Sequence, residues 1–343
     1  MMNGRELIYN SCNNIENPRP PIWLMRQAGR YMADYRQLRE KHSFMELCHN
    51  SDLACEITLQ PIKKFNMDAA ILFSDILVTA EALGAEVDIV EKKGPVIANP
   101  IRSFDDFSKL NDFSKANDEL AYIGKTITKI RNELAPEKAL LGFCGAPLTV
   151  ASYMIEGGSS KDILQTFKMI QNNPELFNNI LSSLSNLTIR YIEMQRENGI
   201  DALQIFESWA SLLPEDMYLE HVFPHLKKII ESCSHPDKPL ILFALAPISL
   251  WKHFAKLPVQ VLSVPSNISF EQIKAIAPNK AIQGNLDSRW LHCSQEQIIR
   301  ETNKILQNPH SKRGFIFNLG HGITPKTPEE NVAALCNHVI NFS

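Results

Sequence analysis

Short apolar runs alternate with longer amphipathic stretches along most of the chain. Residues 69–73 are apolar at every position, a pattern typical of a strand that is buried on both faces. Residues 176–198 instead place Ile180, Leu184 and Leu187 about one helical turn apart, which predicts a helix with one apolar stripe. Runs of the first kind predict eight strands, at residues 22–25, 68–73, 140–144, 201–206, 240–244, 260–264, 281–283 and 314–318.

This alternation predicts an α/β fold, a single (β/α)8 barrel of the TIM type, and 343 residues suit one such domain with insertions. A doubly wound open sheet is the alternative, although the chain lacks the Gly-x-Gly-x-x-Gly fingerprint of a dinucleotide site. Residues 1–19 are polar and asparagine-rich, so we expect a loose N-terminal leader followed by one catalytic barrel domain over residues 20–343. Residues 31–65 have a helical pattern in which Ser51 and Asp52 are placed to cap a second helix.

Composition narrows the classes of partner. Thirty-five Lys and Arg residues against 38 Asp and Glu give a net charge of −3, so nothing favours nucleic acid or an anionic membrane as a partner. Seven scattered cysteines without a Cys-x-x-Cys pair are typical of a reduced, cytoplasmic protein. The longest nearly apolar run, residues 239–251, is shorter than the roughly 20 residues that span a bilayer.

Charged residues follow the first two predicted strands, at the end of a barrel where catalytic groups are found. Arg26 and Arg30 bracket a small Ala28-Gly29 step, which is the form of an anion clamp, and a solvated basic turn is the alternative interpretation. Asp75 follows the second predicted strand in apolar surroundings. It is a candidate functional carboxylate, with a helix N-cap as the alternative.

Later strands are also followed by candidate polar groups. Tyr153 follows the third run, Ser208 the fourth, and His321 lies between two glycines after the last. Ser208 with His321 suggests a hydrolase, but Ser208 lacks the Gly-x-Ser-x-Gly elbow. His221 and His225 are spaced like metal ligands, yet they lack the Glu of His-Glu-x-x-His and lie away from the strand ends. We therefore expect no metal site.

Six segments together resemble the uroporphyrinogen decarboxylase family, in matching order and over roughly residues 20–338. They are Met-Arg-Gln-Ala-Gly-Arg-Tyr at 25–31, Phe-Ser-Asp-Ile-Leu at 73–77, Gly-Phe-Cys-Gly-Ala-Pro at 142–147, Phe-Glu-Ser-Trp at 206–209, Gln-Gly-Asn-Leu-Asp at 283–287 and Asn-Leu-Gly-His-Gly at 318–322. The resemblance implies a single (β/α)8 barrel and a homodimer with facing clefts. It also implies that no cofactor takes part in converting uroporphyrinogen III to coproporphyrinogen III and four CO2, in porphyrin and haem biosynthesis.

The resemblance also implies roles for individual residues. Asp75 matches the carboxylate that accepts hydrogen bonds from the pyrrole N–H groups and favours a cationic intermediate, and we expect it to be ionised. Arg26 and Arg30 match residues that bind substrate carboxylates, and Arg26 is also the candidate for passing the proton or polarising its donor. Arg39 is a further candidate for a carboxylate contact. The remaining matched substrate contacts are Gln27, Ala28 and Gly29 through their backbone, and Tyr153, Ser208 and His321.

The chain departs from the family pattern at several positions. Residues 243–247 replace a glycine-containing loop, Pro265 stands where an Asp commonly follows the strand, Glu207 replaces a usual Asp, and Ser211 stands where Gly is frequent. None of the matched substrate contacts is lost, so we expect activity. Two other functions remain open: a zinc- and corrinoid-linked methyltransferase of the same superfamily, and a non-catalytic porphyrinogen carrier.

Overall fold

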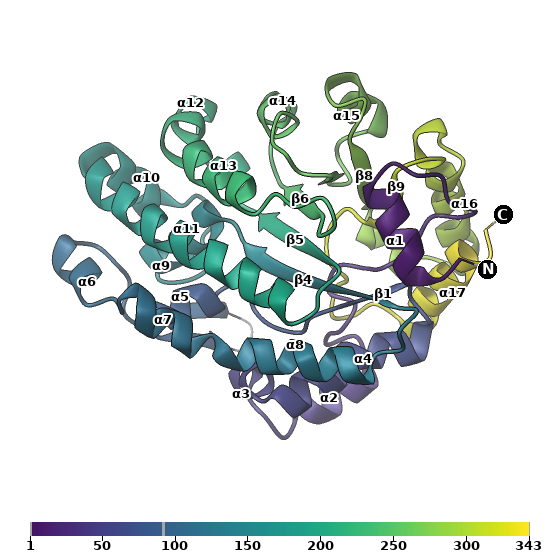
Figure 1. Ribbon diagram of the computed structural model, residues 1–343, viewed down its shortest axis with the longest axis horizontal. Coiled ribbons are helices and arrows are strands. Elements are labelled where there is room, and N and C mark those ends of the chain that lie inside the picture. The colour runs from purple at the N-terminus through teal and green to yellow at the C-terminus, as the bar shows by residue number, and fades with distance from the viewer. Residues whose placement is uncertain (1, 91–92, 343) are drawn as a thin grey trace.

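The computed structural model describes residues 2–90 and 93–342, and its centre is a curled, seven-stranded parallel sheet (Figure 1). Neighbouring strands in the order β1-β4-β5-β6-β7-β8-β9 are hydrogen-bonded in parallel. The strands are β1 (Ala69–Ile71), β4 (Ala139–Gly145), β5 (Ala202–Glu207), β6 (Leu240–Ala244), β7 (Val261–Ser263), β8 (Ala281–Leu286) and β9 (Phe315–Leu319). Seven of the eight predicted strands are thereby confirmed.

Helices separate the strands and pack on the outer side of the sheet (Figure 1). They are α2 (Ala33–Arg39), α3 (Phe44–His49), α4 (Ser51–Phe65), α5 (Val78–Ala82), α6 (Phe104–Ser108), α7 (Phe113–Glu119), α8 (Ala121–Glu133), α9 (Pro147–Glu156), α10 (Leu164–Asn172), α11 (Pro174–Glu197), α12 (Glu215–Met217), α13 (Phe223–Ser232), α14 (Ile248–Phe254), α15 (Phe270–Ile276), α16 (Gln295–Leu306) and α17 (Glu329–Ile340). Short turns of other helix types are η1 (Ala210–Leu212), η2 (Tyr218–Val222), η3 (Ser288–His292) and η4 (Pro309–Ser311). The sequence prediction missed a separate antiparallel hairpin, β2 (Val87–Val90) with β3 (Gly94–Ile97).

The prediction of a regular strand over residues 22–25 is wrong. This segment makes one isolated bridge, between Ile22 and Phe317 of β9. Its backbone still lies between two strands, because Phe317 N–H donates to Pro21 O and Asp68 N–H donates to Ile22 O, each at 2.9 Å. Pro20 and Pro21 have no N–H to donate, which shortens the ladder that this segment can form.

Buried side chains inside the curled sheet tie this segment to the strands across from it. Trp23 Nε1–H donates to Gln283 Oε1 at 2.9 Å. The amide nitrogen of Gln283 donates to Gln204 Oε1 at 2.9 Å and to Ser263 Oγ at 2.8 Å. All of these polar side chains are fully buried, so each depends on the others for its hydrogen bonds. The network thus links residue 23 to β5, β7 and β8.

The prediction of a loose leader over residues 1–19 is also wrong, because helix α1 (Gly4–Cys12) occupies most of it. Asn3 and Glu6 form a capping box at its first turn. Ile8 and Cys12 pack into the apolar cluster inside the sheet, and Ser11 donates a hydrogen bond to Phe315 O at 2.8 Å. The helix was missed because its apolar stripe is short. The polar residues of its exposed face dominate the composition of residues 1–19.

The helices between residues 31 and 65 form as predicted, but the cap differs. Helix α4 begins after Asn50, whose side-chain oxygen accepts from the backbone N–H groups of Asp52 and Leu53. The cap is thus one residue earlier than the predicted Ser51 or Asp52, because Asn is as good a cap as either. Helix α4 then continues through Pro61 to Phe65.

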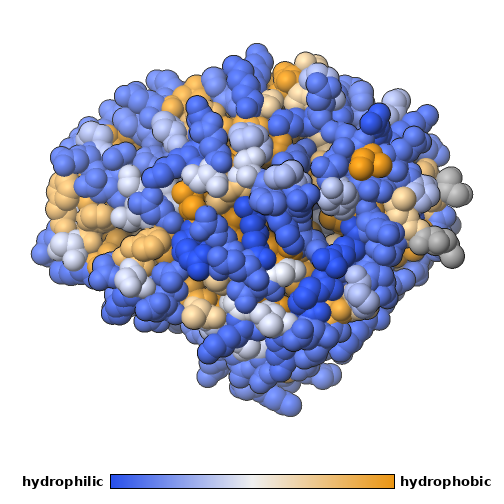
Figure 2. Space-filling model, viewed as in Figure 1, coloured by the Kyte–Doolittle hydropathy of each residue, from blue (hydrophilic) through white to orange (hydrophobic). Residues whose placement is uncertain are grey.

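The surface of the molecule is mainly hydrophilic in the view of Figure 2, with apolar residues gathered at its left end. None of the helices in residues 2–90 and 93–342 combines the length and the apolar character that crossing a bilayer requires.

Asp68 anchors the entry of the first segment, and its loss should destabilise the fold. Its carboxylate accepts two hydrogen bonds from the Arg19 guanidinium, at 2.7 and 2.8 Å, and one from Ile22 N–H at 2.8 Å, while only 2% exposed. We expect Asp68→Ala to lower the free energy of unfolding by about 3 kcal/mol, because it leaves Arg19 without its counter-charge and the buried Ile22 N–H without a partner. Urea denaturation measures this change. Asp105→Ala, which breaks a fully solvated pair with Lys109, is the control and should leave the midpoint unchanged. An equal effect of both substitutions would contradict the anchoring role.

Candidate active site

The predicted site residues come from different segments but from the same end of the sheet. Arg26 follows the first segment, Asp75 follows β1, Tyr153 lies on α9 after β4, Ser208 follows β5, and His321 follows β9. The carboxyl ends of neighbouring parallel strands lie on one side of a curled sheet, so these loops converge.

Arg26 has an unusual backbone conformation that the surrounding structure holds in place. Its φ is +60°, in the left-handed region, which costs a non-glycine residue about 1 kcal/mol or more. The residue before it is fixed on both sides: Met25 N–H donates to Asn318 Oδ1 at 3.0 Å, and Met25 O accepts from Ile323 N–H at 2.9 Å. The Arg26 side chain then runs across Gly322, where an added Cβ would lie 2.5 Å from Arg26 Cδ.

The Asp75 carboxylate is half-buried and only partly engaged by the protein. Its Oδ1 accepts from Leu77 N–H at 2.8 Å, which is a turn contact and not the helix N-cap that was the alternative interpretation, because α5 begins after Leu77. Burial raises the pKa of Asp75, and the Leu77 hydrogen bond and the charge of Arg26 oppose this effect without cancelling it. The expectation that Asp75 is ionised stays a prediction.

Arg26 acts electrostatically on Tyr153 and His321 as well as on Asp75. Burial raises the pKa of the half-buried Tyr153, and among the smaller effects Asp75 raises it and Arg26 lowers it. The His321 ring reaches solvent, yet the protein around it desolvates it enough to lower its pKa, and the charge of Arg26 lowers it further. Both effects favour the neutral imidazole over the charged form. The structure brings these four predicted residues into one electrostatic neighbourhood.

Ser208 lies beside the aromatic part of the site. Its backbone N–H donates to Thr149 Oγ1 at 2.9 Å, on helix α9. The ring of the next residue, Trp209, lies 4.4 Å from the ring of Tyr153, which is one turn further along the same helix. Ser208 and Tyr153 are therefore held by a shared pair of elements.

An aromatic row that the sequence prediction missed covers the top of the sheet interior. Phe143, Phe206 and Phe243 come from neighbouring strands, and their rings pack edge to face with centroids 5.9 Å apart. They share the inward face of β4, β5 and β6 with the apolar cluster below them. The available signal was an aromatic residue near the end of three successive strands. The row provides an apolar floor next to the charged loops.

The turn from Gln27 to Arg30 is placed differently from the other candidates. The Gln27 side chain is fully buried and joins the first segment to β1, since its oxygen accepts from Leu24 N–H and its nitrogen donates to Ala69 O, each at 3.1 Å. Its backbone is engaged as well, because Gln27 N–H donates to Leu24 O at 2.9 Å and Gln27 O accepts from the Tyr31 hydroxyl at 2.6 Å. Arg30 is exposed. Burial raises the pKa of Tyr35, and the nearby charge of Arg30 is one of the smaller effects that lower it.

The remaining candidates near this turn are Ala28, Gly29 and Arg39. Ala28 and Gly29 are half-buried between Gln27 and Arg30. The guanidinium of Arg39 donates to His42 O, so it is already engaged by its own helix end. Its charge also acts on Tyr35, as that of Arg30 does, so a carboxylate contact by Arg39 stays a prediction.

Residues 264–266, one of the departures from the family pattern, contact the loop that carries His321. An added Cβ at Gly320 would lie 2.3 Å from Ser266 N, so the two loops meet at van der Waals distance. Asn285 donates to Pro265 O at 3.2 Å and to Ile268 O at 2.7 Å, which holds this loop from below. The change to Pro265 therefore lies where it affects the shape of the His321 side of the site.

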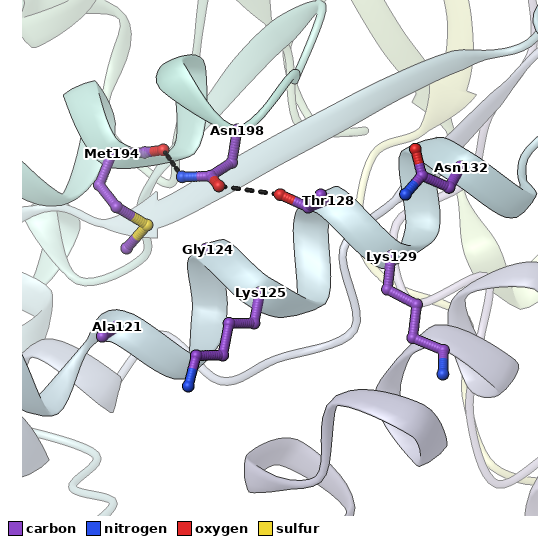
Figure 3. Close-up of a pocket in the computed structure, with 8 residues that line it drawn as sticks. All are labelled: Ala121, Gly124, Lys125, Thr128, Lys129, Asn132, Met194 and Asn198. Atoms are coloured by element: carbon purple, nitrogen blue, oxygen red, sulfur yellow. Dashed lines mark hydrogen bonds between the residues drawn. The ribbon is translucent and has the colours of Figure 1, made fainter.

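A separate pocket lies on the outer helix layer and contains none of the predicted site residues (Figure 3). It is lined by Ala121, Gly124, Lys125, Thr128, Lys129 and Asn132 around α8, and by Met194 and Asn198 at the end of α11. Thr128 donates to Asn198 Oδ1 at 2.9 Å, and Lys129 pairs with Asp52. Its polar groups are thus partly engaged with each other.

Within residues 2–90 and 93–342 no three His, Cys, Asp or Glu side chains are grouped as metal ligands would be. The ring of His225, one of the two histidines considered above, instead hydrogen-bonds Asn178 at 3.1 Å.

Comparison with known proteins gives a family match across the chain. The model of the family described as uroporphyrinogen decarboxylase (URO-D) matches residues 3–342. Uroporphyrinogen decarboxylase of Carboxydothermus hydrogenoformans is 38% identical over 339 residues, covering 98% of this chain and 97% of the relative. The enzyme of that name from Rickettsia bellii is 41% identical over 333 residues and covers 96% of each chain.

Solved structures support the fold. A methyltransferase from Methanosarcina mazei superposes with a TM-score of 0.81, covering 100% of this chain and 99% of that one. At 20% identity this likeness concerns the fold alone.

The contact between Arg26 and Gly322 can be tested by a double-mutant cycle. We expect Gly322→Ala to lower the free energy of unfolding by about 1–3 kcal/mol, because the new methyl group collides with the Arg26 side chain. In an Arg26→Ala background most of this cost should disappear, since the three atoms nearest to the added Cβ all belong to Arg26. Gly29→Ala is the control, because its Cβ would meet only Arg26 O, at 3.5 Å. If the two substitutions lowered the free energy of unfolding additively, the Arg26 side chain would not be in contact with Gly322.

Proposed function

The chain belongs to the uroporphyrinogen decarboxylase family, and on this premise we propose that it decarboxylates the four acetate side chains of uroporphyrinogen III. The products are coproporphyrinogen III and four CO2, in porphyrin and haem biosynthesis. The observation that carries the proposal for this chain is the half-buried Asp75 carboxylate beside Arg26, above an aromatic floor. This arrangement suits a ligand with an apolar macrocycle, inward N–H groups and peripheral carboxylates.

The substrate itself supplies the electron sink, so the proposed reaction requires no cofactor. A proton added to the ring carbon beside the acetate-bearing carbon makes the pyrrole cationic. The bond between the acetate methylene and its carboxylate then breaks, CO2 leaves, and the electron pair of that bond neutralises the ring. The methylene carbon takes a proton to become a methyl group, and the ring carbon returns its own. Each cycle therefore consumes one proton and releases one CO2.

Asp75 is the proposed catalytic carboxylate for the cationic step. Its Oδ1 is oriented by Leu77 N–H, and the carboxylate accepts hydrogen bonds from the pyrrole N–H groups. Because burial raises the pKa of Asp75, these donors and the positive ring stabilise its charged form, and the charged form in turn stabilises the ring. Each such charge-assisted hydrogen bond contributes roughly 1.5–3 kcal/mol.

Arg26 is the proposed ligand of a substrate carboxylate. Its backbone is fixed through Met25, so the point from which the side chain reaches the substrate is set before the substrate arrives. We also propose that Arg26 polarises the group that delivers the proton. A guanidinium, with a pKa above about 12, is itself too weak an acid to be the main donor.

The other predicted residues complete the substrate contacts in this proposal. A neutral His321 donates one N–H to a propionate or acetate, and Tyr153 and Ser208 contribute hydroxyl groups from the far side. Arg30 binds a peripheral carboxylate from its exposed position. The backbone of Ala28 and Gly29 lines the wall between the two arginines. The Gln27 backbone, for which the same contact was expected, is hydrogen-bonded to Leu24 and Tyr31 and supports this turn from inside.

We propose that residues 22–25 complete a closed (β/α)8 barrel, with residues 20–343 as one catalytic domain. The hydrogen bonds of Pro21 and Ile22 to β9 and to the start of β1 support this closure. We also propose a cytoplasmic location. The seven cysteines are free thiols, six of them buried, as suits a reducing compartment.

The activity is tested by anaerobic incubation with uroporphyrinogen III and chromatography of the oxidised porphyrins. We expect the eight-carboxyl species to be replaced by the four-carboxyl product. Asp75→Gly should abolish the first decarboxylation while the circular dichroism spectrum stays unchanged, because the cationic ring loses its counter-charge. Arg26→Ala should weaken both substrate binding and turnover. Asp237→Gly, an exposed aspartate in the turn before β6, is the matched control.

Each outcome of this assay has a separate meaning. If the wild-type chain returned only the eight-carboxyl species, it would be a carrier and not a decarboxylase. Near-normal turnover by Asp75→Gly would remove the role of its charge. Stoichiometric zinc in the purified protein would favour the methyltransferase alternative.

We further propose a homodimer with facing clefts. Phe104, Phe113 and Leu164 are 44%, 51% and 45% exposed on α6, α7 and α10. These helices lie at the left end of the molecule, towards which β4 and β5 run, and apolar surface gathers there (Figures 1 and 2). Sedimentation equilibrium should give twice the chain mass of 38.8 kDa, and Phe104→Ser with Phe113→Ser should shift the chain towards monomer. A wild-type monomer at micromolar concentration would contradict this proposal.

A further inference from the structure

Glu207 is a fully buried carboxylate that the proposed reaction does not use. It is the last residue of β5, and its side chain is on the face opposite to Phe206, between the sheet and the surrounding helices. It has no access to the cleft. Its position nevertheless directly precedes Ser208, one of the proposed substrate contacts.

The Glu207 carboxylate joins three elements through hydrogen bonds. Thr149 Oγ1–H on α9 donates to Oε1 at 2.7 Å, and Tyr218 O–H on η2 donates to Oε2 at 3.3 Å. Because the Thr149 hydroxyl donates its only hydrogen to Glu207, its lone pairs are free to accept from Ser208 N–H, at 2.9 Å. The carboxylate therefore sets the direction of the hydrogen bond that holds the Ser208 backbone.

The same contact sets the position of Tyr153. Thr149 and Tyr153 are one turn apart on α9, so the hydrogen bond from Thr149 to Glu207 fixes the height of this helix against β5. Tyr153 then packs on Trp209, two residues beyond Glu207, with ring centroids 4.4 Å apart. Tyr153 on α9 and Trp209 after β5 are therefore both attached to the two elements that Glu207 joins.

We propose that Glu207 is a positioning residue that holds Ser208 and Tyr153 in place at the cleft through Thr149. It acts from beneath and does not touch the substrate. The kinetic test of this inference rests on the proposed function. A second, spectroscopic test is independent of the proposed function.

The charge of Glu207 is part of this device, because every group that faces the carboxylate is a donor. These groups are Thr149 from α9, Tyr218 from η2, and the backbone N–H of Trp209 from the following loop. The neighbouring strands add no charge, since Ala244 of β6 is paired with Glu207 and Gly145 of β4 with Phe206. A protonated Glu207 would direct its own O–H at one of these donors, so protonation disturbs the network.

Protonation of Glu207 falls within a range that can be measured. Burial raises its pKa to about 7, although the three hydrogen bonds oppose the shift. Tyr218 stays protonated throughout, because burial and the nearby Glu207 raise its pKa far above the usual range. The pKa of Glu207 is higher in the folded chain than in the unfolded chain. Its contribution to stability is therefore fully present below about pH 4.5 and is lost as the pH rises through about 7.

The kinetic test follows the first decarboxylation from pH 5.5 to 8.5 in four variants. We expect Glu207→Gln to raise KM roughly tenfold, with a smaller change in kcat, and to remove an ionisation near pH 7 from the profile of kcat/KM. Glu207→Asp should restore part of the KM and keep an ionisation. Thr149→Val should raise KM and move the ionisation to higher pH, because it removes one donor to the carboxylate. Thr302→Val is the control, a threonine equally buried on α16.

Trp209 provides the test that does not need turnover. Its fluorescence, obtained as the difference from Trp209→Phe, should titrate near pH 7 in the wild-type chain and not in Glu207→Gln. If the wild-type chain were inactive but this titration were present, the proposed function would fail and the positioning role would stand. A folded Glu207→Gln variant with wild-type KM, pH profile and fluorescence titration would overturn the positioning role. If the Glu207 variants did not fold, an unchanged KM and pH profile in Thr149→Val would overturn it.

Discussion

The position of Arg26 depends on buried side-chain hydrogen bonds, because the segment that carries it has almost no strand ladder. Gln283 binds Trp23, Asn318 binds Met25 N–H, and Gln27 binds Ala69 O. All three amide side chains are fully buried, so the alternative to each contact is an unsatisfied polar group without water. The segment is thus specified by a few directional contacts, and its last turn is tight enough to hold Arg26 in a left-handed conformation.

The two faces of the sheet contribute different properties to the cleft. The inward face ends in Phe143, Phe206 and Phe243, which offer an apolar surface. The outward face of β5 ends in Glu207, which binds α9 and holds the next loop. Because side chains alternate along a strand, adjacent residues 206 and 207 serve both faces at once. An apolar surface and support for the following loop therefore come from neighbouring positions of one strand.

Asp75 illustrates how the protein and a ligand share the cost of a buried charge. The protein supplies one backbone donor and the nearby charge of Arg26, and these do not cancel the effect of burial on the pKa of Asp75. A ligand with several N–H groups and a transient positive charge would complete the set of donors. In the proposed reaction, this incomplete set of donors is what would favour such a ligand.

The sequence by itself determined the elements whose periodicity is regular and the residues that follow them. Seven strands, the long helix α11 and the order of the site loops could be predicted, because burial on both faces and an apolar stripe leave local patterns. The family could be named from six short segments, and the match over residues 3–342 agrees. The tertiary structure decided the rest. Helix α1 is specified by the apolar cluster that Ile8 and Cys12 pack against. The first segment is held by amide side chains such as Gln283 from a distant strand. The proposed role of Glu207 depends on Thr149, a residue 58 positions away. Such contacts join residues far apart in the chain, so no local pattern records them.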